Sequence, residues 1–157
     1  MIKEATGLAV RREVNVDVAR ERAFEVFTGA METWFSHHLG DAPPVRIVVE
    51  PRAGGRWFER AADGTECDWG FVTEWEPPMR VLFAWHLSHE WKFDPDPARA
   101  TAIEVLFHAE GPAATRVELE HRGFEVLGEH AREVADAVGS ENGWNGLLQQ
   151  FAQAVRT

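Results

Sequence analysis

Three side chains on predicted strands have types that could carry out acid–base or nucleophilic chemistry. Glu59 and His121 supply the carboxylate and imidazole that transfer protons when both reach one substrate atom. Cys67 beside a histidine could act as a nucleophile. Each residue also has a structural alternative: Glu59 could pair with Arg56 or Arg60, His121 could be a hydrogen-bonded core residue, and Cys67 could be small apolar filling. Residue type alone leaves both sets of roles open.

Aromatic rings dominate the segment from Pro51 to Trp85. The chain has seven Trp, ten Phe and no Tyr, and four of the tryptophans lie in this segment, namely Trp57, Trp69, Trp75 and Trp85. Aromatic side chains bury large areas, and they line sites for apolar or flat molecules as readily as they fill a core. The segment therefore predicts a wide aromatic interior.

The sequence predicts no metal site and no cofactor site. In the run HLSHE, His86 and His89 match neither H-E-x-x-H nor H-x-x-E-H, and the adjacent His37 and His38 would diverge. The one cysteine excludes multi-cysteine zinc sites and an internal disulfide. We therefore expect any site to act through side chains alone.

The elements that must position these residues follow from apolar periodicity. Helical spacing predicts helices at 19–28, around Trp34 and Phe35, over 125–138, and from Trp144 to the C-terminus. Alternation predicts seven strands, at residues 8–18, 45–49, 55–60, 66–76, 80–87, 101–109 and 115–122. Strands in series with helices at the ends indicate an α+β fold with an antiparallel sheet. The last helix must bury its apolar stripe against that sheet.

Length and charge narrow the classes of function. The 157 residues fit one domain, predicted to span residues 1–157. A net charge of −10 argues against nucleic acid and against an anionic membrane, because both attract basic patches. The N-terminal run has no apolar signal region, and no stretch of about 18 apolar residues occurs. We expect a cytoplasmic protein, for which a homodimer stays open.

Strand parity predicts which side chains face the interior. In the last strand the charged residues share one face, so Leu119 and His121 must point inward. In the longest strand Cys67, Trp69 and Phe71 share a face opposite an aspartate. The strand that carries Glu59 stays ambiguous, because each of its faces bears a charge. The predicted ligand-binding residues are Trp57, Glu59, Cys67, Trp69, Phe83, Trp85, Phe107, Leu119, His121 and Trp144.

The order of these elements resembles the helix-grip superfamily of START-like and Bet v 1-like proteins, also called SRPBCC. Within it, the chain is most similar to the bacterial branch related to the C-terminal domain of the Hsp90 ATPase activator. The resemblance covers nearly the whole chain and rests on VRREVNVDVARERAFEVFT, PRAGGRWFER, GFVTEWEPPMRVLFAW, TRVELEHRGF and GWNGLLQQF in that order. It implies a curved antiparallel sheet wrapped around a long C-terminal helix, often with a hydrophobic cavity between them.

Three functions follow from these observations. The first is binding of a small hydrophobic or aromatic ligand in a cavity between the sheet and the last helix, as many members of the family bind lipids, hormones or polyketides. The second is an enzyme, such as a cyclase or hydrolase, with His121 and Glu59 as acid–base groups in the same cavity. The third is a chaperone-associated interaction module. We favour the first, because the predicted inward set consists mostly of rings with few polar members.

Overall fold

Seven strands form one antiparallel sheet in the computed structural model, which describes residues 8–156. Their order is β1-β7-β6-β5-β4-β3-β2, so consecutive strands pair except that β1 pairs with β7. The strands are β1 (Val10–Val16), β2 (Arg46–Val49), β3 (Arg56–Arg60), β4 (Glu66–Glu76), β5 (Arg80–Trp85), β6 (Thr101–Gly111) and β7 (Ala114–Arg122). All seven predicted strands are present, with no end displaced by more than two residues. Residues 1–7 and 157 of the predicted domain lie outside the described part.

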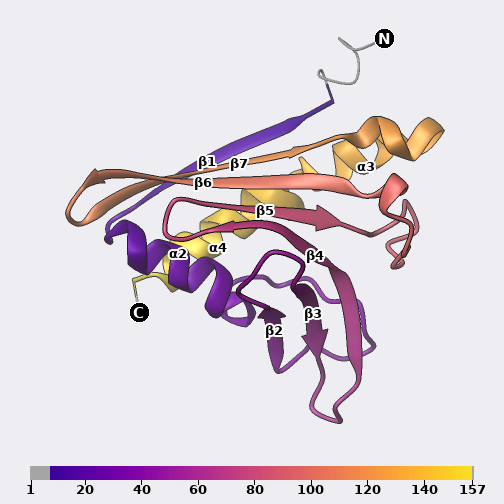
Figure 1. The fold of residues 1–157 in the computed structure, drawn as a ribbon, viewed down its shortest axis with the longest axis horizontal. Coiled ribbons are helices and arrows are strands. Elements are labelled where there is room, and N and C mark those ends of the chain that lie inside the picture. Colours follow the sequence, from indigo (N-terminus) through magenta and orange to yellow (C-terminus); the bar gives the residue numbers. More distant parts are fainter. Residues whose placement is uncertain (1–7, 157) are drawn as a thin grey trace.

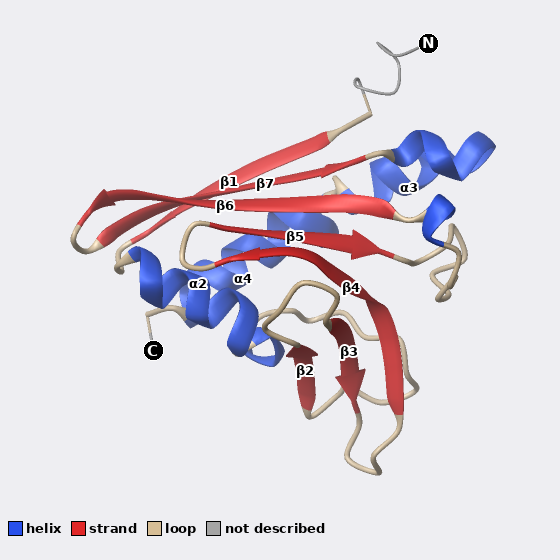
Figure 2. Cartoon of the chain, viewed as in Figure 1, coloured by secondary structure: helices blue, strands red, loops and turns tan. Residues whose placement is uncertain are grey.

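Helices pack on the concave face and at one end of this sheet. The α-helices are α2 (Arg20–Gly29), α3 (Ala131–Val138) and α4 (Gly146–Ala154); 3₁₀ turns lie at Met31–Thr33, Pro97–Arg99 and Phe124–His130, and a π-helical turn at Glu141–Asn145. Figures 1 and 2 show the sheet curving around α4 with α2 beside it, and α3 at the end of the sheet far from α2. This arrangement confirms the predicted α+β helix-grip fold. No helix within residues 8–156 is long and apolar enough to cross a membrane.

The C-terminal segment folds as two helices with an irregular connection. The predicted helix over 125–138 is 3₁₀ up to His130 and α-helical only in α3. The next segment begins as the π-helical turn, in which Gly143 has non-helical dihedral angles (φ −93°, ψ −134°). A Cβ at this position would lie 2.2 Å from the carbonyl oxygen of Val138, so the close approach requires glycine. The helix gripped by the sheet is therefore shorter than predicted, and Trp144 lies in the turn before it.

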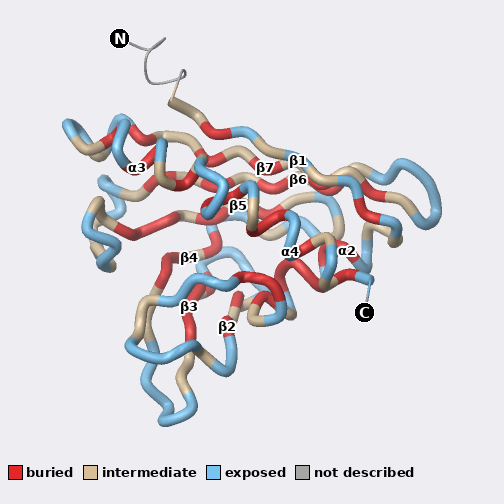
Figure 3. Tube along the Cα trace, turned by 180° about the vertical axis from the view of Figure 1, so that it is seen from behind, coloured by how far each residue is buried: buried red, intermediate tan, exposed pale blue. Residues whose placement is uncertain are grey.

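The apolar core lies between the concave face of the sheet and the helices. Figure 3 shows buried segments running along the strands, while the β3–β4 hairpin tip is exposed. Burial alternates along β5, β7 and most of β6. The predicted inward residues of these strands are all buried, namely Phe83, Trp85, Phe107, Leu119 and His121. A slip of one residue would expose a whole face, so this alternation fixes the register of the three strands.

Strand β3 is buried on both faces, which resolves its ambiguous parity. Trp57 and Glu59 are buried on the inner face. Phe58 is buried on the outer face beneath the guanidinium of Arg56, whose carbon lies 3.9 Å from the ring centroid. This cation–π contact covers the ring without a second protein layer. The charged residues on the outer face of β3 are thus arginines, and the charged residue on its inner face is Glu59.

A β-bulge interrupts β4 beside this strand. Trp57 pairs with Gly70 and Phe58 pairs with Asp68, so Trp69 is an extra residue on β4. Bulges place two residues opposite one and increase the local twist. Both Trp69 and Gly70 are buried as a result.

The bulge reverses the parity of the next residues. Phe71 leaves the inner face and packs against His86 and Phe93, with ring centroids 5.0 and 6.3 Å away, whereas Val72 turns inward and is buried. The prediction that Phe71 faces the interior with Trp69 is therefore wrong. A second irregularity at Thr73 restores the original parity.

The bulge depends on the absence of a side chain at Gly70. A Cβ there would lie 1.9 Å from the carbonyl oxygen of Ala84 on β5. Gly70→Ala must push β4 and β5 apart, and we expect it to lower the free energy of unfolding by on the order of 3 kcal/mol. Urea denaturation followed by circular dichroism measures the loss.

The matched control is Gly29→Ala at the end of α2, where nothing lies within 4 Å of the added Cβ. Alanine is the better helix former, so we expect a gain of about 0.5 kcal/mol. Equal stability of the two variants would contradict the steric argument.

Candidate functional site

An apolar pocket of about 320 Å³ opens at one end of the core. It lies between the inner face of β4 and β5, the segment after the 3₁₀ turn Met31–Thr33, and the connection from α3 to α4. Small-molecule pockets span roughly 300–1,000 Å³, so the volume suits a compact ligand. The lining residues are Phe35, His37, His38, Leu39, Trp69, Trp85, Leu87, Trp91, Ala137, Val138, Ser140, Asn142, Gly143, Trp144 and Leu147.

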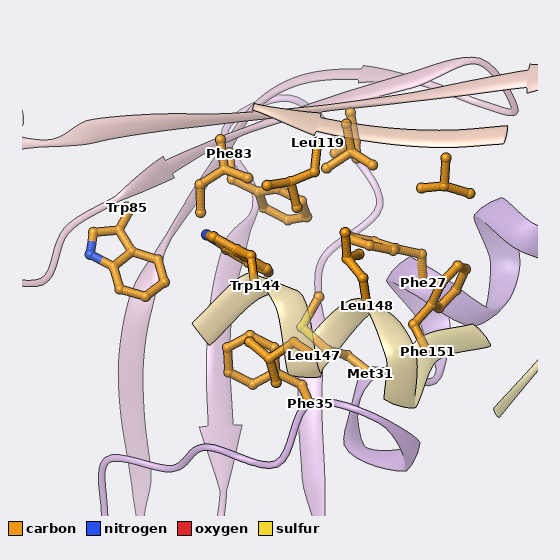
Figure 4. Close-up of a cluster of buried hydrophobic side chains, with 14 of the residues drawn as sticks. Phe27, Met31, Phe35, Phe83, Trp85, Leu119, Trp144, Leu147, Leu148 and Phe151 are labelled. Atoms are coloured by element: carbon orange, nitrogen blue, oxygen red, sulfur yellow. The ribbon is translucent and has the colours of Figure 1, made fainter. Parts of the chain in front are cut away.

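Four rings make a continuous aromatic wall in this pocket. Phe35 packs edge-on against Trp69 with centroids 5.1 Å apart, and Trp69 lies 5.5 Å from Trp85. Trp144 lies 6.4 Å from Trp85 and 6.2 Å from Phe35, which closes the set. Figure 4 shows Trp144 and Leu147 on the helical segment, with Trp85 on the strand side and Phe35 below. The wall thus joins β4, β5, a loop and the π-helical turn.

Glu59 holds Trp69 and the neighbouring loop in place. Its side chain is 3% exposed, and its carboxylate accepts hydrogen bonds from Trp69 Nε1 at 2.9 Å, Leu39 N at 2.8 Å and Gly40 N at 3.0 Å. A buried carboxylate is tolerated when such donors replace its water. The arginines of β3 pair instead with acidic residues on the outer face. Glu59 is therefore a buried support for the wall, and the alternative in which it pairs with Arg56 or Arg60 is not what the structure shows.

His121 supports Trp144 in the same way. The fully buried ring accepts a hydrogen bond from Trp144 Nε1 at its Nδ1 (3.1 Å), and its Nε2 lies 2.8 Å from Thr101 Oγ1. Because an indole nitrogen can only donate, Nδ1 is unprotonated and Nε2 carries the hydrogen of the neutral ring. Burial lowers the pKa of His121 to about 3, so the ring is neutral at pH 7. These contacts describe a hydrogen-bonded core histidine.

The structure does not bring Glu59 and His121 together. They lie on β3 and β7, with three strands between them, and neither lines the pocket. Cys67 pairs with Glu59 across the β3–β4 ladder. Burial, together with the negative charge of Glu59, raises the pKa of the Cys67 thiol, which disfavours the nucleophilic thiolate. The predicted acid–base pair is Glu59 and His121, and the predicted nucleophilic pair is Cys67 and His121. Neither pair therefore has a shared position at which both members could contact one substrate atom.

The rim of the pocket carries two imidazoles. His37 Nε2 lies 2.6 Å from the carbonyl oxygen of Asn142, and His38 Nδ1 lies 2.8 Å from the carbonyl oxygen of Gly40. Since a carbonyl oxygen accepts, each ring donates through one nitrogen and, when neutral, keeps the other as an acceptor. His37 also links the rim loop, which is the segment at residues 37–40, to the π-helical turn. These are the two titratable side chains among the lining residues of the described chain.

Trp91 lines the pocket from the loop after β5. It does so although 43% of its surface is exposed, and its φ of 62° lies in the left-handed region that bulky residues rarely adopt. The turn is held by Ser88, whose carbonyl oxygen accepts from Trp91 N at 2.9 Å and whose hydroxyl accepts from Glu90 N at 3.2 Å. An exposed indole held in this conformation is available to contact a bound molecule.

Three of the ten predicted site residues line the pocket, namely Trp69, Trp85 and Trp144. Six of the others are buried in the core or as supports behind the wall, namely Trp57, Glu59, Phe83, Phe107, Leu119 and His121, and Cys67 is half-buried. Sequence reasoning missed Phe35, the rim histidines and Trp91, because they lie in irregular segments where alternation assigns no face. Over residues 8–156, no three His, Cys, Asp or Glu side chains converge in a group that could hold a metal ion.

The buried His121 makes stability depend on pH. Its pKa in the folded chain, about 3, is below the ordinary value of 6.5, so the unfolded chain takes up a proton first as pH falls. The stabilisation is complete above about pH 6.5 and is lost progressively toward pH 3. Between pH 7 and pH 5 the wild type should lose about 2 kcal/mol from this residue. His121→Gln should lack this loss. The difference in free energy of unfolding between the wild type and the variant, measured by urea denaturation, should therefore shrink by that amount from pH 7 to pH 5. Parallel pH profiles would contradict the assignment.

Comparisons with known proteins agree with this architecture. The family model described as Activator of Hsp90 ATPase homolog 1-like protein matches residues 17–156. The anthrahydroquino-γ-pyrone synthase Txn09 is 37% identical over 92% of this chain and 95% of its own, with a TM-score of 0.67. CalC, a self-sacrificing resistance protein from Micromonospora echinospora, is 28% identical over 94% of this chain and 93% of its own, with a TM-score of 0.70.

The fold extends to more distant structures. Protein NE0264 from Nitrosomonas europaea is 14% identical, with 96% of each chain covered and a TM-score of 0.68. A comparison with curated protein sequences finds no match. The family match spans most of the chain, and the structural neighbours share the curved sheet with its C-terminal helices. The chain therefore belongs to the Activator of Hsp90 ATPase homolog 1-like family, within the START-like and Bet v 1-like superfamily.

Proposed function

We propose that this protein binds a flat, fused-ring aromatic molecule in the pocket between the sheet and α4. The carrying observation is the wall of four rings, Phe35, Trp69, Trp85 and Trp144, around an apolar space of about 320 Å³. Indole and phenyl rings offer both faces and edges to a planar ligand. Few polar groups line the space, which is the usual composition of a small-molecule site.

Relatives support this choice of ligand. The synthase at 37% identity is named for an anthrahydroquino-γ-pyrone, a compound of several flat rings, and it covers nearly the whole of this chain. The resistance protein at 28% identity shares the fold over a similar length. The wide aromatic pocket of this chain would fit a ligand of several flat rings, like the compound for which the synthase is named.

The wall is held in position without a ligand. Trp69 and Trp144 each donate their indole hydrogen to a buried partner, and both are 3% exposed. Ring positions fixed in advance reduce the ordering cost of binding. The pocket is therefore built to accept a rigid planar molecule with little rearrangement of its inner surface.

Filling the pocket should abolish binding. Ala137 lines it from α3, and Ala137→Phe adds a ring on that side. Anthracene-2-sulfonate and anthraquinone-2-sulfonate are suitable soluble probes of the proposed class. We expect the wild type to bind at least one of them, and the dissociation constant to rise at least about tenfold in the variant, because the ligand and the new ring cannot share the space. Isothermal titration calorimetry measures both constants.

Ala98→Phe is the matched control, since Ala98 is exposed in the turn Pro97–Arg99 and does not line the pocket. It should bind as the wild type does. Failure of the wild type to bind either probe, or unchanged binding in Ala137→Phe, would overturn the proposed function.

Catalysis in the same pocket is the second candidate, favoured by the similarity to a synthase. The titratable groups at hand are then His37 and His38, in place of the predicted pair of Glu59 and His121. Each rim histidine has one ring nitrogen committed to a carbonyl oxygen and the other available as a base. Ring closure onto an enone would need such a base to take a phenolic proton, after which the phenolate oxygen bonds to the β-carbon and a proton returns to the α-carbon.

The cyclisation of 2′-hydroxychalcone to flavanone tests this chemistry, because it follows those steps without a co-reactant. If the protein is catalytic, it should accelerate the loss of chalcone absorbance, and His37→Gln or His38→Gln should slow the reaction by on the order of 10²-fold. Binding without acceleration would leave the protein as a binder. Equal rates in both variants and the wild type would exclude the rim histidines as bases.

A chaperone-associated role is the third function predicted from the sequence. Its support is the family description, which names activation of the Hsp90 ATPase. One fold hosts many activities, so a family description carries less weight than a formed site. We therefore rank this role below binding and catalysis.

A further inference from the structure

Two buried indole N–H groups in this protein have no hydrogen-bond acceptor. Within residues 8–156, the buried side-chain nitrogens without a partner are Trp57 Nε1, Trp85 Nε1 and Arg20 Nε. Buried polar groups in folded proteins are nearly always hydrogen-bonded, so each of these requires an explanation. Trp57 lies in the core and does not line the pocket, whereas Trp85 is part of the pocket wall.

The three wall tryptophans differ in this respect. Trp69 donates to Glu59 at 2.9 Å and Trp144 donates to His121 at 3.1 Å, so their hydrogen atoms are committed within the chain. Trp85 is equally buried, with 4% of its surface exposed, but its hydrogen is not committed.

The neighbours of Trp85 explain why the chain offers it no acceptor. Rings surround it, with Trp69 at 5.5 Å, Trp57 at 5.9 Å and His121 at 5.1 Å between centroids. Both nitrogens of His121 are already engaged, one by Trp144 and the other at the hydroxyl of a threonine. Within residues 8–156 no acceptor pairs with Trp85 Nε1, which leaves this hydrogen for an oxygen of a bound molecule.

We propose that Trp85 Nε1 donates a hydrogen bond to an oxygen of the bound molecule, and that this bond selects fused-ring ligands that carry a ring carbonyl, such as quinones or pyrones, over the corresponding hydrocarbons. The inference rests on the proposed function, since it concerns the same pocket. A site with a buried donor rejects a ligand without the matching acceptor, because that ligand leaves the donor unpaired. The lining side chains His37, His38, Ser140 and Asn142 are exposed at the rim, so among the wall tryptophans Trp85 carries the uncommitted donor.

Paired probes of matched shape test this selection. Anthraquinone-2-sulfonate and anthracene-2-sulfonate share three fused rings and one anionic group, and differ at the two ring carbonyls. The readout is the ratio of their two dissociation constants, in which a general change of packing cancels. We expect the wild type to bind the quinone about fivefold more tightly or better, and Trp85→Phe to bring the ratio close to one.

Trp57→Phe is the matched control. It removes the other orphan indole hydrogen from the same core, so it tests whether loss of any tryptophan there changes the ratio. We expect it to keep the wild-type ratio, whatever its effect on stability.

A spectroscopic measurement on the unmodified protein covers the case in which Trp85→Phe does not fold. In ¹H–¹⁵N correlation spectra of the wild type, the quinone should move one indole N–H signal downfield, as a new hydrogen bond does, and the hydrocarbon should not. Equal binding of the two probes to the wild type, or an unchanged ratio in Trp85→Phe, overturns the inference and leaves the proposed function intact. Failure of both probes to bind overturns the proposed function, and the inference with it.

Discussion

The pocket's geometry depends on the hydrogen bonds that the buried carboxylate of Glu59 accepts. Three N–H groups converge on it, and they come from two parts of the chain, the indole of Trp69 on β4 and the backbone at Leu39 and Gly40. A carboxylate in this place loses its water, and only a set of donors of this kind makes its burial tolerable. The same bonds therefore stabilise the charge, orient one wall ring and attach the rim loop to the sheet.

His121 on β7 is the counterpart of Glu59 on β3, on the same inner face of the sheet. It is neutral, so it supports Trp144 as an acceptor without the cost of a buried charge. Two residues whose types are typical of catalysts thus act as hydrogen-bond acceptors for tryptophan. The positions of the wall rings thus depend on Glu59 on β3 and His121 on β7 as much as on the packing of the rings themselves. An acceptor buried beneath an indole gives it one orientation, which apolar packing alone would not.

Much of the fold could be predicted from the sequence, because it follows from strict local periodicity. The charged outer face of β7 forces Leu119 and His121 inward, and the structure confirms both. The exceptions have a common cause. The bulge at Trp69 depends on the backbone of Gly70 lying against Ala84, a contact between strands that no local pattern contains. Parity counted along β4 is therefore reliable only up to the bulge.

The candidate site was less predictable than the fold for the same reason. Trp69, Trp85 and Trp144 lie in segments whose apolar spacing in the sequence has strand or helix periodicity, and they are the predicted residues that line the pocket. Phe35 and Trp91 lie in irregular segments, where the facing of a side chain is set by tertiary contacts such as the turn around Ser88. Knowing that a side chain faces inward also does not tell whether it lines the pocket or lies in the core behind it. That difference depends on where the packing of side chains leaves space.

Under the proposed function, the wall and the rim of the pocket would make different contributions to binding. The wall rings lie on strands, on the π-helical turn and, for Phe35, in a loop, and they are buried; two of the four, Trp69 and Trp144, are also held by hydrogen bonds, which reduces the ordering that a ligand would require. At the rim, His37 donates a hydrogen bond to the carbonyl oxygen of Asn142, and the exposed Trp91 also lines the pocket. If a ligand enters past this bond, as the proposed function requires, it meets exposed rim side chains first and the buried wall behind them. On that proposal, affinity depends mainly on the wall, and the rate of entry mainly on the rim.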